Sequence, residues 1–256
     1  MLAEERHKVI CEMVNKKKAV RVSDLSKQLN ITEATVRRDL DELQSEKKLR
    51  RTHGGAVALY PVGNEYVISE LAVENIDEKR KIARKAYEFI DDHDAVLFDG
   101  SSTVLELSRI LAAGDRKGVI VVTNALSVAN VLAIKKDIQV IHTGGEIRYH
   151  INSTVGKIAE RTIRDMRVDK TYIGINGIDP EFGYSITNFD EAAVKKEMVT
   201  CAKQSFVLAD STKFGKSYLA KVAEPEGEID FVITDVKNED YDYDQLEERV
   251  HMTYAD

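Results

Sequence analysis

Hydrophobic and polar residues follow two different patterns along the chain. Up to about residue 57, apolar residues recur at intervals of three and four, which predicts short amphipathic helices. From about residue 95, short apolar runs alternate with helical stretches, which predicts buried strands joined by helices. With 256 residues, the chain is long enough for one small and one mid-sized domain.

Three helices are predicted in the first segment. Apolar residues at helical spacing predict a first helix that ends near Asn15, followed by a short strand over residues 19–22 that pairs with a later hairpin. A second helix is expected to begin with Ser23 as its N-cap and to end at Asn30, which accommodates a left-handed backbone. Thr32 is then expected to cap a third helix, which completes a helix-turn-helix.

The third helix carries a polar face that suits duplex DNA. Its buried stripe consists of Val36, Leu40 and Leu43. Its free face carries Ala34, Thr35, Arg37 and Arg38. In helix-turn-helix proteins such a face enters the major groove, where arginine reads guanine through two parallel hydrogen bonds. The alternative is that the two arginines pair with Asp41 and Glu42 and only solvate the helix; because such pairs are weak in water, DNA contact is favoured.

A basic β-hairpin follows. Residues 49–57 predict two short strands around a glycine turn, and arginines beside such a turn can reach DNA phosphates or the minor groove, as a wing does. His53 has no second His or Cys at ligand spacing, so a phosphate contact is a better expectation than a metal site. The predicted DNA-contacting residues are Ser23, Thr32, Ala34, Thr35, Arg37, Arg38, Arg50, Arg51, His53 and Gly54.

Charge is unevenly distributed. Residues 1–57 contain 13 Lys and Arg against 9 Asp and Glu, a net charge of +4; since the whole chain carries −7, residues 58–256 carry −11. Because only the N-terminal segment is basic, the attraction for phosphate backbones is confined to that end of the chain. The charged N-terminus and the lack of a long apolar run predict a cytoplasmic protein that does not enter the membrane. Cys11 and Cys201 stand alone, so neither a disulfide nor a metal pair is expected.

Three motifs in this segment resemble a known family. They are Val22-Ser23-Asp24-Leu25, Thr35-Val36-Arg37-Arg38-Asp39-Leu40 and Arg51-Thr52-His53-Gly54-Gly55-Ala56. In this order and spacing they are similar to the N-terminal signature of the DeoR family of bacterial transcriptional regulators. The expected domains are a winged helix-turn-helix over residues 1–58, a linker over 59–75 and an effector domain over 76–256.

The remainder of the chain predicts a mostly parallel α/β domain. After a helix over residues 76–91, strands are expected at 95–98, 119–122, 138–141, 171–175, 206–209 and 231–234. Helices are expected at 104–112, 126–134, 156–166 and 191–202. Apolar strands that alternate with helices form a sheet covered on both faces, and ligands bind beyond the carboxyl ends of its strands. The acidic tail after Asp235 is expected to be a solvated connection.

Small polar residues follow four of these strands. They are Asp99-Gly100-Ser101-Ser102-Thr103, Thr123-Asn124, Thr143-Gly144-Gly145 and Asp210-Ser211-Thr212-Lys213. Backbone N–H groups and hydroxyls at a helix start can bind phosphate, and glycine lets a ligand approach the backbone. Each fragment alone is ordinary capping, but four at one sheet edge favour a ligand pocket.

The resemblance to the DeoR family extends through this domain, on residues 98–103, 122–124, 144–145, 174–178, 191–195 and 208–215. It implies a sensor for a phosphorylated sugar, with a fold shared with sugar-phosphate isomerases. Phosphate is then expected on Ser101, Ser102, Thr103 and Lys213, sugar hydroxyls on Asp99, Asn124 and Asp210, and charge neutralisation by Lys195. Backbone contacts from Gly100, Thr123, Gly144 and Gly145 complete the predicted site. One departure is visible: the family commonly has Asp-x-Gly-Thr-Thr, whereas here glycine precedes two serines.

These observations favour a transcriptional repressor of a sugar-metabolism operon. The expected partners are double-stranded operator DNA, a phosphorylated sugar effector and further copies of the chain, as a dimer or tetramer with recognition helices about 34 Å apart or a multiple of that. No cofactor and no catalytic residue are expected. The alternative is a sugar-phosphate isomerase-like enzyme that uses Asp99, Asp179, Glu191 or Asp210 as a general base. A module that binds RNA or protein is disfavoured, because no aromatic residue lies on the free helix face.

Overall fold

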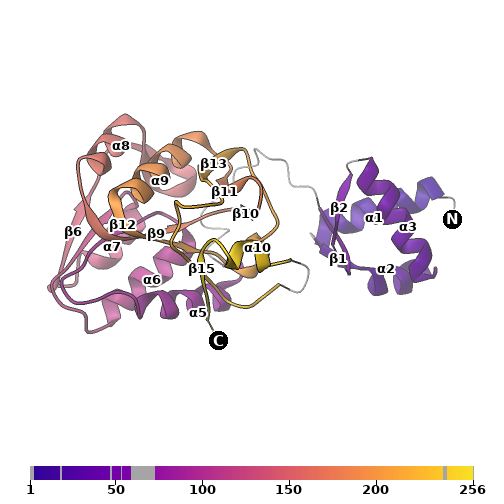
Figure 1. Ribbon diagram of the computed structural model, residues 1–256, viewed down its shortest axis with the longest axis horizontal. Coiled ribbons are helices and arrows are strands. Elements are labelled where there is room, and N and C mark those ends of the chain that lie inside the picture. The colour runs from indigo at the N-terminus through magenta and orange to yellow at the C-terminus, as the bar shows by residue number, and fades with distance from the viewer. Residues whose placement is uncertain are drawn as a thin grey trace. The chain divides into compact units, whose positions relative to one another are not determined.

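The computed structural model describes residues 3–17, 19–46, 48–52, 54–58, 73–238 and 241–255. Contacts within the chain divide it into two compact units, N-terminal and C-terminal, and each is described by itself (Figure 1). Most of the predicted linker, residues 59–72, lies outside the described residues, as does His53. The last part of that linker, residues 73–75, forms a turn directly before the first helix of the C-terminal unit.

The N-terminal unit is a winged helix-turn-helix, as predicted. Its helices are α1 (Ala3–Lys17), α2 (Val22–Leu29) and α3 (Glu33–Ser45). Its strands are β1 (Ala19–Arg21), β2 (Leu49–Thr52) and β3 (Gly55–Ala58), which form an antiparallel sheet in the order β1-β3-β2. Residues such as Ile10, Leu25, Val36, Leu40 and Leu43 are fully buried between the helices and form one apolar core.

Two helix boundaries differ from the prediction. α1 continues to Lys17 rather than ending near Asn15. α2 begins at Val22 with Arg21 in the N-cap position and no side-chain cap, so the prediction that Ser23 caps this helix was wrong. The backbone N–H of Val22 donates instead to the carbonyl oxygen of Gly54, at 2.8 Å, so the β-hairpin satisfies a donor at the helix start.

The C-terminal unit is built on a parallel sheet of seven strands, in the order β15-β14-β12-β9-β4-β5-β6. The strands are β4 (Ala95–Phe98), β5 (Val119–Thr123), β6 (Ile138–His142), β9 (Val168–Gly174), β12 (Ala202–Leu208), β14 (Phe231–Thr234) and β15 (His251–Tyr254). All but β15 overlap predicted strands. The strand order reverses between β4 and β9, and a reversal of this kind opens a crevice at the carboxyl ends of the strands.

Helices cover both faces of this sheet, which explains why its central strands β4 and β5 are almost entirely apolar. On one face lie α5 (Ile76–Tyr87), α6 (Ser102–Ala113) and α7 (Leu126–Leu132), and on the other lie α8 (Lys157–Arg164) and α9 (Phe189–Cys201) (Figure 1). α5 is shorter than the predicted helix over residues 76–91. No helix among the described residues is long and apolar enough to span a membrane.

Smaller elements surround the carboxyl edge of the sheet. β7 (Glu146–Arg148) and β8 (Ser153–Val155) form a hairpin that encloses the short helix η1 (Tyr149–Ile151). β10 (Gly177–Asp179), β11 (Gly183–Ile186) and β13 (Ala220–Ala223) form a second, antiparallel sheet. A second short helix, η2 (Ser211–Lys213), follows β12. The sequence pattern did not predict these elements, because their strands are short and mix apolar with polar residues or glycine.

A row of aromatic rings crosses the centre of the sheet. Phe98, Tyr172, Phe206 and Phe231 are neighbours in register on β4, β9, β12 and β14. Tyr172 and Phe206 stack with ring centroids 4.8 Å apart, and Phe206 and Phe231 stack at 4.6 Å. Burial raises the pKa of the Tyr172 phenol well above its usual value, so this hydroxyl stays neutral. The stacked rings hold β4, β9, β12 and β14 in register, and the crevice lies at the ends of β4 and β9.

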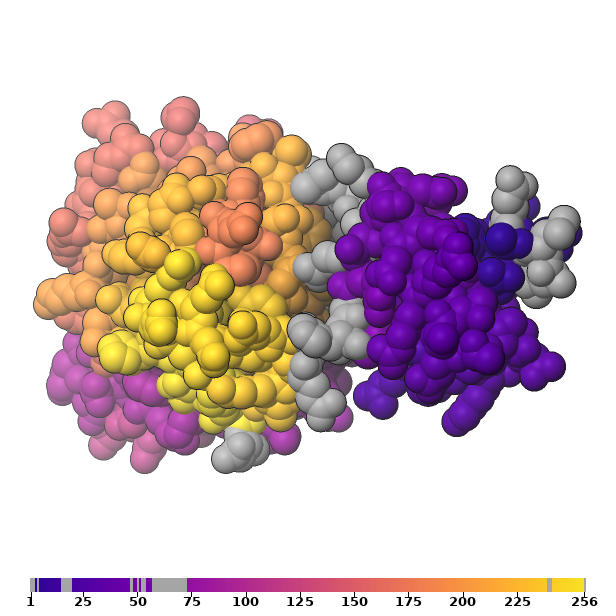
Figure 2. Space-filling model, turned by 45° about the vertical axis from the view of Figure 1, so that its right-hand side comes forward, coloured from indigo at the N-terminus to yellow at the C-terminus, as the bar shows by residue number. Residues whose placement is uncertain are grey.

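The C-terminal tail is part of the fold, and the prediction of a solvated connection was wrong. The tail forms α10 (Asp244–Glu247) and then β15, which extends the parallel sheet beside β14. Tyr243, Leu246 and Val250 are buried. Figure 2 shows this segment, in yellow, lying along the surface of the C-terminal unit. The acidic residues between these apolar residues hid their helical spacing.

The packing of the tail gives a first prediction. Leu246→Ala should lower the free energy of unfolding of the C-terminal unit by about 2–5 kcal/mol, because it removes a buried side chain and leaves a cavity. Urea titration followed by circular dichroism measures this change. Gln245→Ala, at an exposed position in the same helix, is the control and should change stability little. Equal stability of the two variants would contradict the assignment of the tail to the core.

Candidate functional site

The free face of α3 is formed as the sequence predicts. Thr32 caps the helix, and its Oγ1 accepts a hydrogen bond from the backbone N–H of Thr35 at 3.2 Å. Val36, Leu40 and Leu43 are fully buried, so the helix cannot rotate without exposing its apolar stripe. The residues left at the surface are Ala34, Arg37 and Arg38, which are exposed, and Thr35, which is half-buried.

Each of the two arginines on this face has an acidic partner on the same helix. Arg38 lies 3.2 Å from Glu42, as the alternative interpretation of the sequence expected. Arg37 pairs with Glu33 at 3.4 Å rather than with Asp41. Both pairs are exposed, and the side chain of Arg38 is 82% exposed, so the arginines can exchange these partners for DNA.

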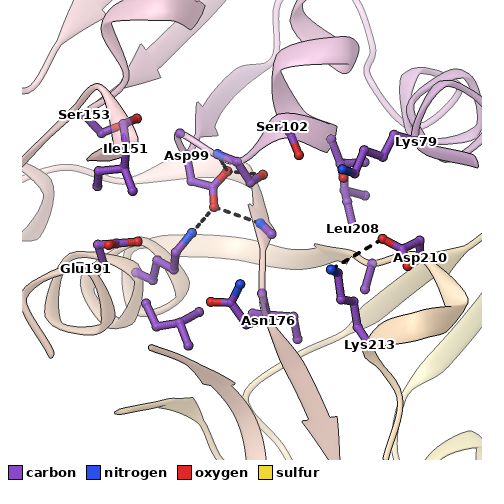
Figure 3. Close-up of a pocket in the computed structure, with 18 of the residues that line it drawn as sticks. Lys79, Asp99, Ser102, Ile151, Ser153, Asn176, Glu191, Leu208, Asp210 and Lys213 are labelled. Carbon is purple, nitrogen blue, oxygen red and sulfur yellow. Dashed lines mark hydrogen bonds and ion pairs between the residues drawn. The ribbon is translucent and has the colours of Figure 1, made fainter. Parts of the chain in front are cut away.

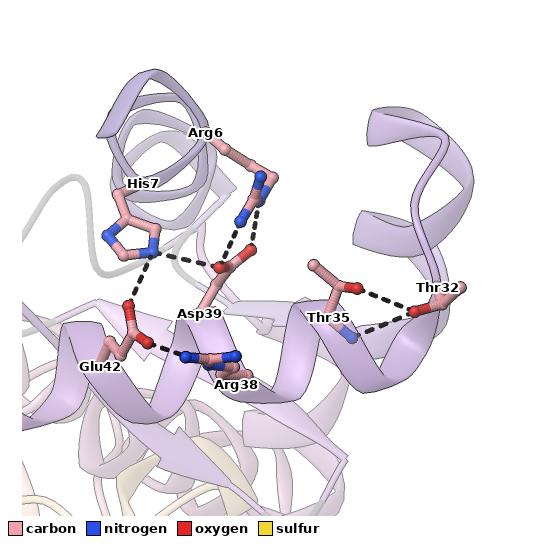
Figure 4. A network of polar contacts seen from close by, with 7 residues as sticks. All are labelled: Arg6, His7, Thr32, Thr35, Arg38, Asp39 and Glu42. Atoms are coloured by element: carbon pink, nitrogen blue, oxygen red, sulfur yellow. Dashed lines mark hydrogen bonds and ion pairs between the residues drawn. The ribbon is translucent and has the colours of Figure 1, made fainter. Parts of the chain in front are cut away.

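An ion-pair network that the sequence did not reveal ties α3 to α1 (Figure 4). Asp39 is buried, and both its oxygens accept hydrogen bonds from Arg6, at 2.5 and 2.7 Å. His7 Nε2 lies 3.2 Å from the same carboxylate. Burial alone would raise the pKa of Asp39, but Arg6 and His7 outweigh burial and hold that pKa below its usual value.

The same network contains the one group of potential metal ligands found among the described residues. The ligand atoms of His7, Asp39 and Glu42 lie within 4.8 Å of one another. The guanidinium of Arg6 already binds both oxygens of Asp39, and Arg38 binds Glu42. These positive charges disfavour a cation at the same place, so the group is an ion-pair network.

The wing is joined to α3 through Arg51. Its Nη1 donates to Asp41 at 2.6 Å, and its backbone N–H donates to the side-chain oxygen of Gln44, also at 2.6 Å. Arg51 therefore fixes the position of the wing. Ser23 is half-buried within α2, and Gly54 is exposed at the tip of the hairpin. The side chain of Arg50 and all of His53 lie outside the described residues.

In the C-terminal unit, the strand ends meet around a cavity of about 80 Å³ (Figure 3). This is several times the roughly 10–15 Å³ that one water molecule needs. Predicted residues that line it are Asp99, Gly100, Ser101, Ser102, Thr103, Asn124, Lys195, Asp210 and Lys213. Thr123, Gly144 and Gly145 do not line it. Thr123 is buried, and its hydroxyl accepts from the backbone N–H of Ala125 at 3.0 Å.

Further lining residues were not predicted as part of the ligand site, although Glu191 was named as a possible general base in the enzyme alternative. The polar ones are Lys79, Ser153, Asn176 and Glu191. The apolar residues and glycine are Ile151, Gly174, Ile175, Ile186, Leu208 and Ala209. They come from α5, α9, the β7–β8 hairpin and the strand ends, so only the tertiary fold brings them together. Lys79 lies on the buried face of α5, with Ile82 and Ala86. A lysine on an apolar helix face is unusual, and this is the sequence signal that could have identified it.

Asp99 is the best-connected side chain of the cavity. It is 1% exposed, and its Oδ1 accepts from the backbone N–H and the hydroxyl of Ser101, at 2.9 and 2.7 Å. Its Oδ2 accepts from the backbone N–H of Gly174 at 2.8 Å and from Lys195. These four donors fill the acceptor positions of a carboxylate. Asp99 therefore joins the loop after β4 to the end of β9 and to α9, across the point where the strand order reverses.

Gly174 permits the close approach of the loop after β4 to the end of β9. A β-carbon at position 174 would lie 2.4 Å from Cβ of Ser101, which is too short for any real contact. Glycine lets the two strand ends meet, so that its N–H reaches Asp99. Ser101 in turn caps α6, with its hydroxyl oxygen 3.4 Å from the backbone nitrogen of Val104.

The cavity has a cationic side. Figure 3 shows Lys79, Asp210 and Lys213 together, opposite Ile151, Ser153 and Glu191. Burial and nearby Lys213 lower the pKa of Lys79, while Asp210 opposes this. Burial alone would raise the pKa of Asp210, but Lys213, Thr212 and Lys79 together hold it below its usual value. Two lysines thus face one ionised carboxylate on this side, and Lys213 lies 3.8 Å from it.

Helix α6 adds backbone donors beside these lysines. Among the described residues, no hydrogen-bond acceptor is present for the backbone N–H groups of Ser102 and Thr103, in the first turn of α6. Both residues line the cavity. Unpaired N–H groups at a helix start, together with the helix dipole, favour an anion.

The start of α5 is connected to the cavity. Lys79 donates to the carbonyl oxygen of Glu74 at 2.6 Å, and the side-chain amide of Asn75 donates to Asp210 at 3.3 Å. Asn75 has a left-handed backbone with φ 51°, which turns the chain into the helix. The residues through which the chain enters the C-terminal unit are therefore held by two cavity residues.

A winged helix-turn-helix joined to a parallel α/β domain with a polar cavity defines the class of ligand-sensing DNA-binding regulators. The family model described as the DeoR-like helix-turn-helix domain matches residues 6–61. The model described as the DeoR C terminal sensor domain matches residues 74–236, which is more than half of the chain. The chain belongs to the DeoR family of transcriptional regulators, and the resemblance seen in its sequence is confirmed.

Relatives match over nearly the whole length. The uncharacterized HTH-type transcriptional regulator YulB of Bacillus subtilis (strain 168) is 36% identical, over 92% of this chain and 90% of its own. The HTH-type transcriptional regulator GlpR of Haloferax volcanii is also 36% identical, over 92% and 91%. The glycerol-3-phosphate regulon repressor of Escherichia coli (strain K12) is 28% identical, over 92% of each chain.

Solved structures match more distantly. D-ribose-5-phosphate isomerase in complex with phospho-erythronic acid is 16% identical over 54% of each chain, with a TM-score of 0.41. Ribose 5-phosphate isomerase A from Methanocaldococcus jannaschii is 16% identical over 55% of each chain, with a TM-score of 0.39. These matches span about half the length of the isomerase chains.

The Asp99–Lys195 pair gives a second prediction. Lys195→Met should lower the free energy of unfolding of the C-terminal unit by about 3–5 kcal/mol, because it leaves a buried carboxylate without its cation. Lys196→Met, at the neighbouring exposed position, removes the same charge and should have little effect. Chemical denaturation of the two variants measures the difference. Equal stabilities would contradict the anchoring role of the pair.

Proposed function

We propose that this regulator represses a sugar-metabolism operon and that a phosphorylated sugar in the cavity controls its affinity for operator DNA. The single observation that carries the proposal is the pair Lys79 and Lys213 beside the unpaired backbone donors of α6. This is the chemistry that binds a phosphate group. The name of the E. coli relative, a glycerol-3-phosphate regulon repressor, supports both repression and a phosphorylated metabolite.

The charges support one orientation of the ligand. Its phosphate lies at the N-terminus of α6, between Lys79, Lys213 and the hydroxyls of Ser102 and Thr103. Its hydroxyls point to the opposite side, towards Asn124, Asn176 and Glu191. Asn124 Oδ1 is buried with no hydrogen-bond donor among the described residues, so it can accept from a hydroxyl. The Asn124 amide nitrogen donates to the carbonyl oxygen of Thr154 at 2.8 Å, which fixes this orientation of the amide.

Two cavity residues take different roles from those expected. Asp99 was expected to bind sugar hydroxyls, but its four acceptor positions are filled by protein donors. We assign it to positioning Ser101 and Lys195. Lys195 was expected to neutralise the ligand, but it is 8% exposed and paired with Asp99. The ligand's phosphate therefore depends on Lys79 and Lys213.

For DNA, we propose that residues 1–58 form the binding domain and that α3 enters the major groove. Arg37 and Arg38 then reach base edges or phosphates, with Ala34, Thr35 and Thr32 nearby. The wing places Arg50, His53 and Gly54 against the DNA backbone, while Arg51 holds the wing on α3. A dimer or tetramer presents two such helices to two half-sites, in the cytoplasm where the operator lies.

The enzyme alternative is not supported. The family and the relatives are named as transcriptional regulators, so the chain is a regulator rather than an isomerase. Asp99 also cannot serve as a general base while it is saturated with hydrogen bonds.

A third prediction concerns DNA. Arg38→Ala should weaken binding to an operator duplex roughly 5- to 150-fold, because one good arginine–base contact is worth about 1–3 kcal/mol. The control is Arg161→Ala on α8, since the two side chains are 82% and 84% exposed. Fluorescence anisotropy with a duplex selected from a random pool measures the affinity. Unchanged affinity of the Arg38 variant would refute α3 as the recognition helix.

A fourth prediction concerns the ligand. Isothermal titration calorimetry with ribose, glucosamine and tagatose phosphates should find a binder, and Lys213→Ala should weaken it roughly tenfold or more. Lys157→Ala, an exposed lysine on α8 outside the cavity, is the control and should leave the affinity unchanged. Binding that is insensitive to Lys213, or equal binding of the unphosphorylated sugars, would contradict the placement of the phosphate.

A further inference from the structure

The pairing of Arg38 with Glu42 runs against the usual preference of a helix. In isolated helices an acidic residue four positions before a basic one is stabilising, and the reverse order is less so. Arg37 and its partner Glu33 have the favourable order. Arg38 and Glu42 have the reverse order, yet lie slightly closer, at 3.2 Å against 3.4 Å. The second pair also has support from outside the helix.

That support comes from α1. Nε2 of His7 lies 3.6 Å from Oε2 of Glu42, while Oε1 of Glu42 faces Arg38 (Figure 4). His7 is itself held 3.2 Å from Asp39, whose carboxylate is bound at both oxygens by Arg6. The carboxylate of Glu42 thus lies between Arg38 and His7. Among the described residues, Glu33 forms no ion pair besides that with Arg37.

We propose that Glu42 is a specificity-determining residue, because it competes with DNA for Arg38. A single phosphate offers Arg38 a negative charge much like the one that Glu42 already supplies. The Arg38–Glu42 pair must open in either complex, so its loss weakens both equally. What differs is the new partner of Arg38: a phosphate is negatively charged and is repelled by the nearby Glu42. A guanine edge is uncharged, so it is not repelled in this way, and it offers Arg38 two parallel hydrogen bonds.

The consequence is discrimination. Glu42 weakens binding to any DNA, but it weakens non-specific binding more than operator binding. A genome offers a vast excess of non-specific sites. The ratio of operator affinity to non-specific affinity therefore determines what fraction of the protein is bound to the operator. The inference rests on the proposed role of α3 as the recognition helix.

The test uses the full-length protein and fluorescence anisotropy with two labelled duplexes, one of mixed sequence and one selected from a random pool. Glu42→Gln keeps the shape of the side chain and removes its charge. It should tighten binding to the mixed-sequence duplex roughly two- to fivefold, the range expected for one exposed ion pair. It should change binding to the selected duplex less. The plot of log affinity against log salt should steepen by about one for the mixed sequence.

The matched control is Glu46→Gln. Glu46 follows α3 directly, and its side chain is 48% exposed, the same as that of Glu42, but its partner is Lys48. A second control places Glu42→Gln in an Arg38→Ala background, where it should have no further effect. Both glutamates are exposed, so the variants should fold; circular dichroism checks this, and Glu42→Ala should shift affinity in the same direction as Glu42→Gln.

Three results would overturn the inference. Equal tightening by the Glu42 and Glu46 variants would show a general effect of charge. An effect of Glu42→Gln that persists without Arg38 would show that the two residues do not act together. If Arg38→Ala alone leaves DNA affinity unchanged, the assignment of α3 fails as well. A tightening that depends on Arg38, while operator discrimination falls, supports the inference and the recognition helix together.

Discussion

The carboxylate of Asp99 is the interaction on which the effector domain depends. Burying an ion is costly unless its acceptor positions are filled, and here two backbone N–H groups, a hydroxyl and Lys195 fill them. The donors come from the β4 loop, the end of β9 and α9, which lie on both sides of the reversal in strand order. One side chain thus joins the two sides of the crevice that this topology opens. Ser101 and the first turn of α6 take their positions from it.

The same principle recurs in the DNA-binding domain. Asp39 is buried at the junction of α1 and α3 and is bound at both oxygens by Arg6, so α3 is held from its polar side as well as by its apolar stripe. In each domain a saturated acidic residue provides the framework. Basic side chains near it, Arg38 in one and Lys213 in the other, are held through fewer contacts and can exchange partners.

The sequence predicted what depends on local pattern. Six strands, the helices between them and the recognition face all follow from apolar spacing, and most residues at the strand ends do line the cavity. It did not predict Lys79, Asn176 or the pairing of Arg6 with Asp39, because those contacts join residues far apart in the chain. The tail was misjudged for another reason: its acidic residues are conspicuous in the sequence, whereas its fold depends on the buried Tyr243, Leu246 and Val250. Ser23 was misplaced because α2 already begins at Val22, so Ser23 lies within the helix rather than before it.

The anchoring of the chain at Glu74 and Asn75 has a mechanical consequence. Lys79 and Asp210 each hold one of these residues while also lining the cavity. Neither side chain can reorient without loosening or tightening the first turn of α5. The residues that precede α5 and the wall of the cavity are therefore mechanically coupled through these two hydrogen bonds.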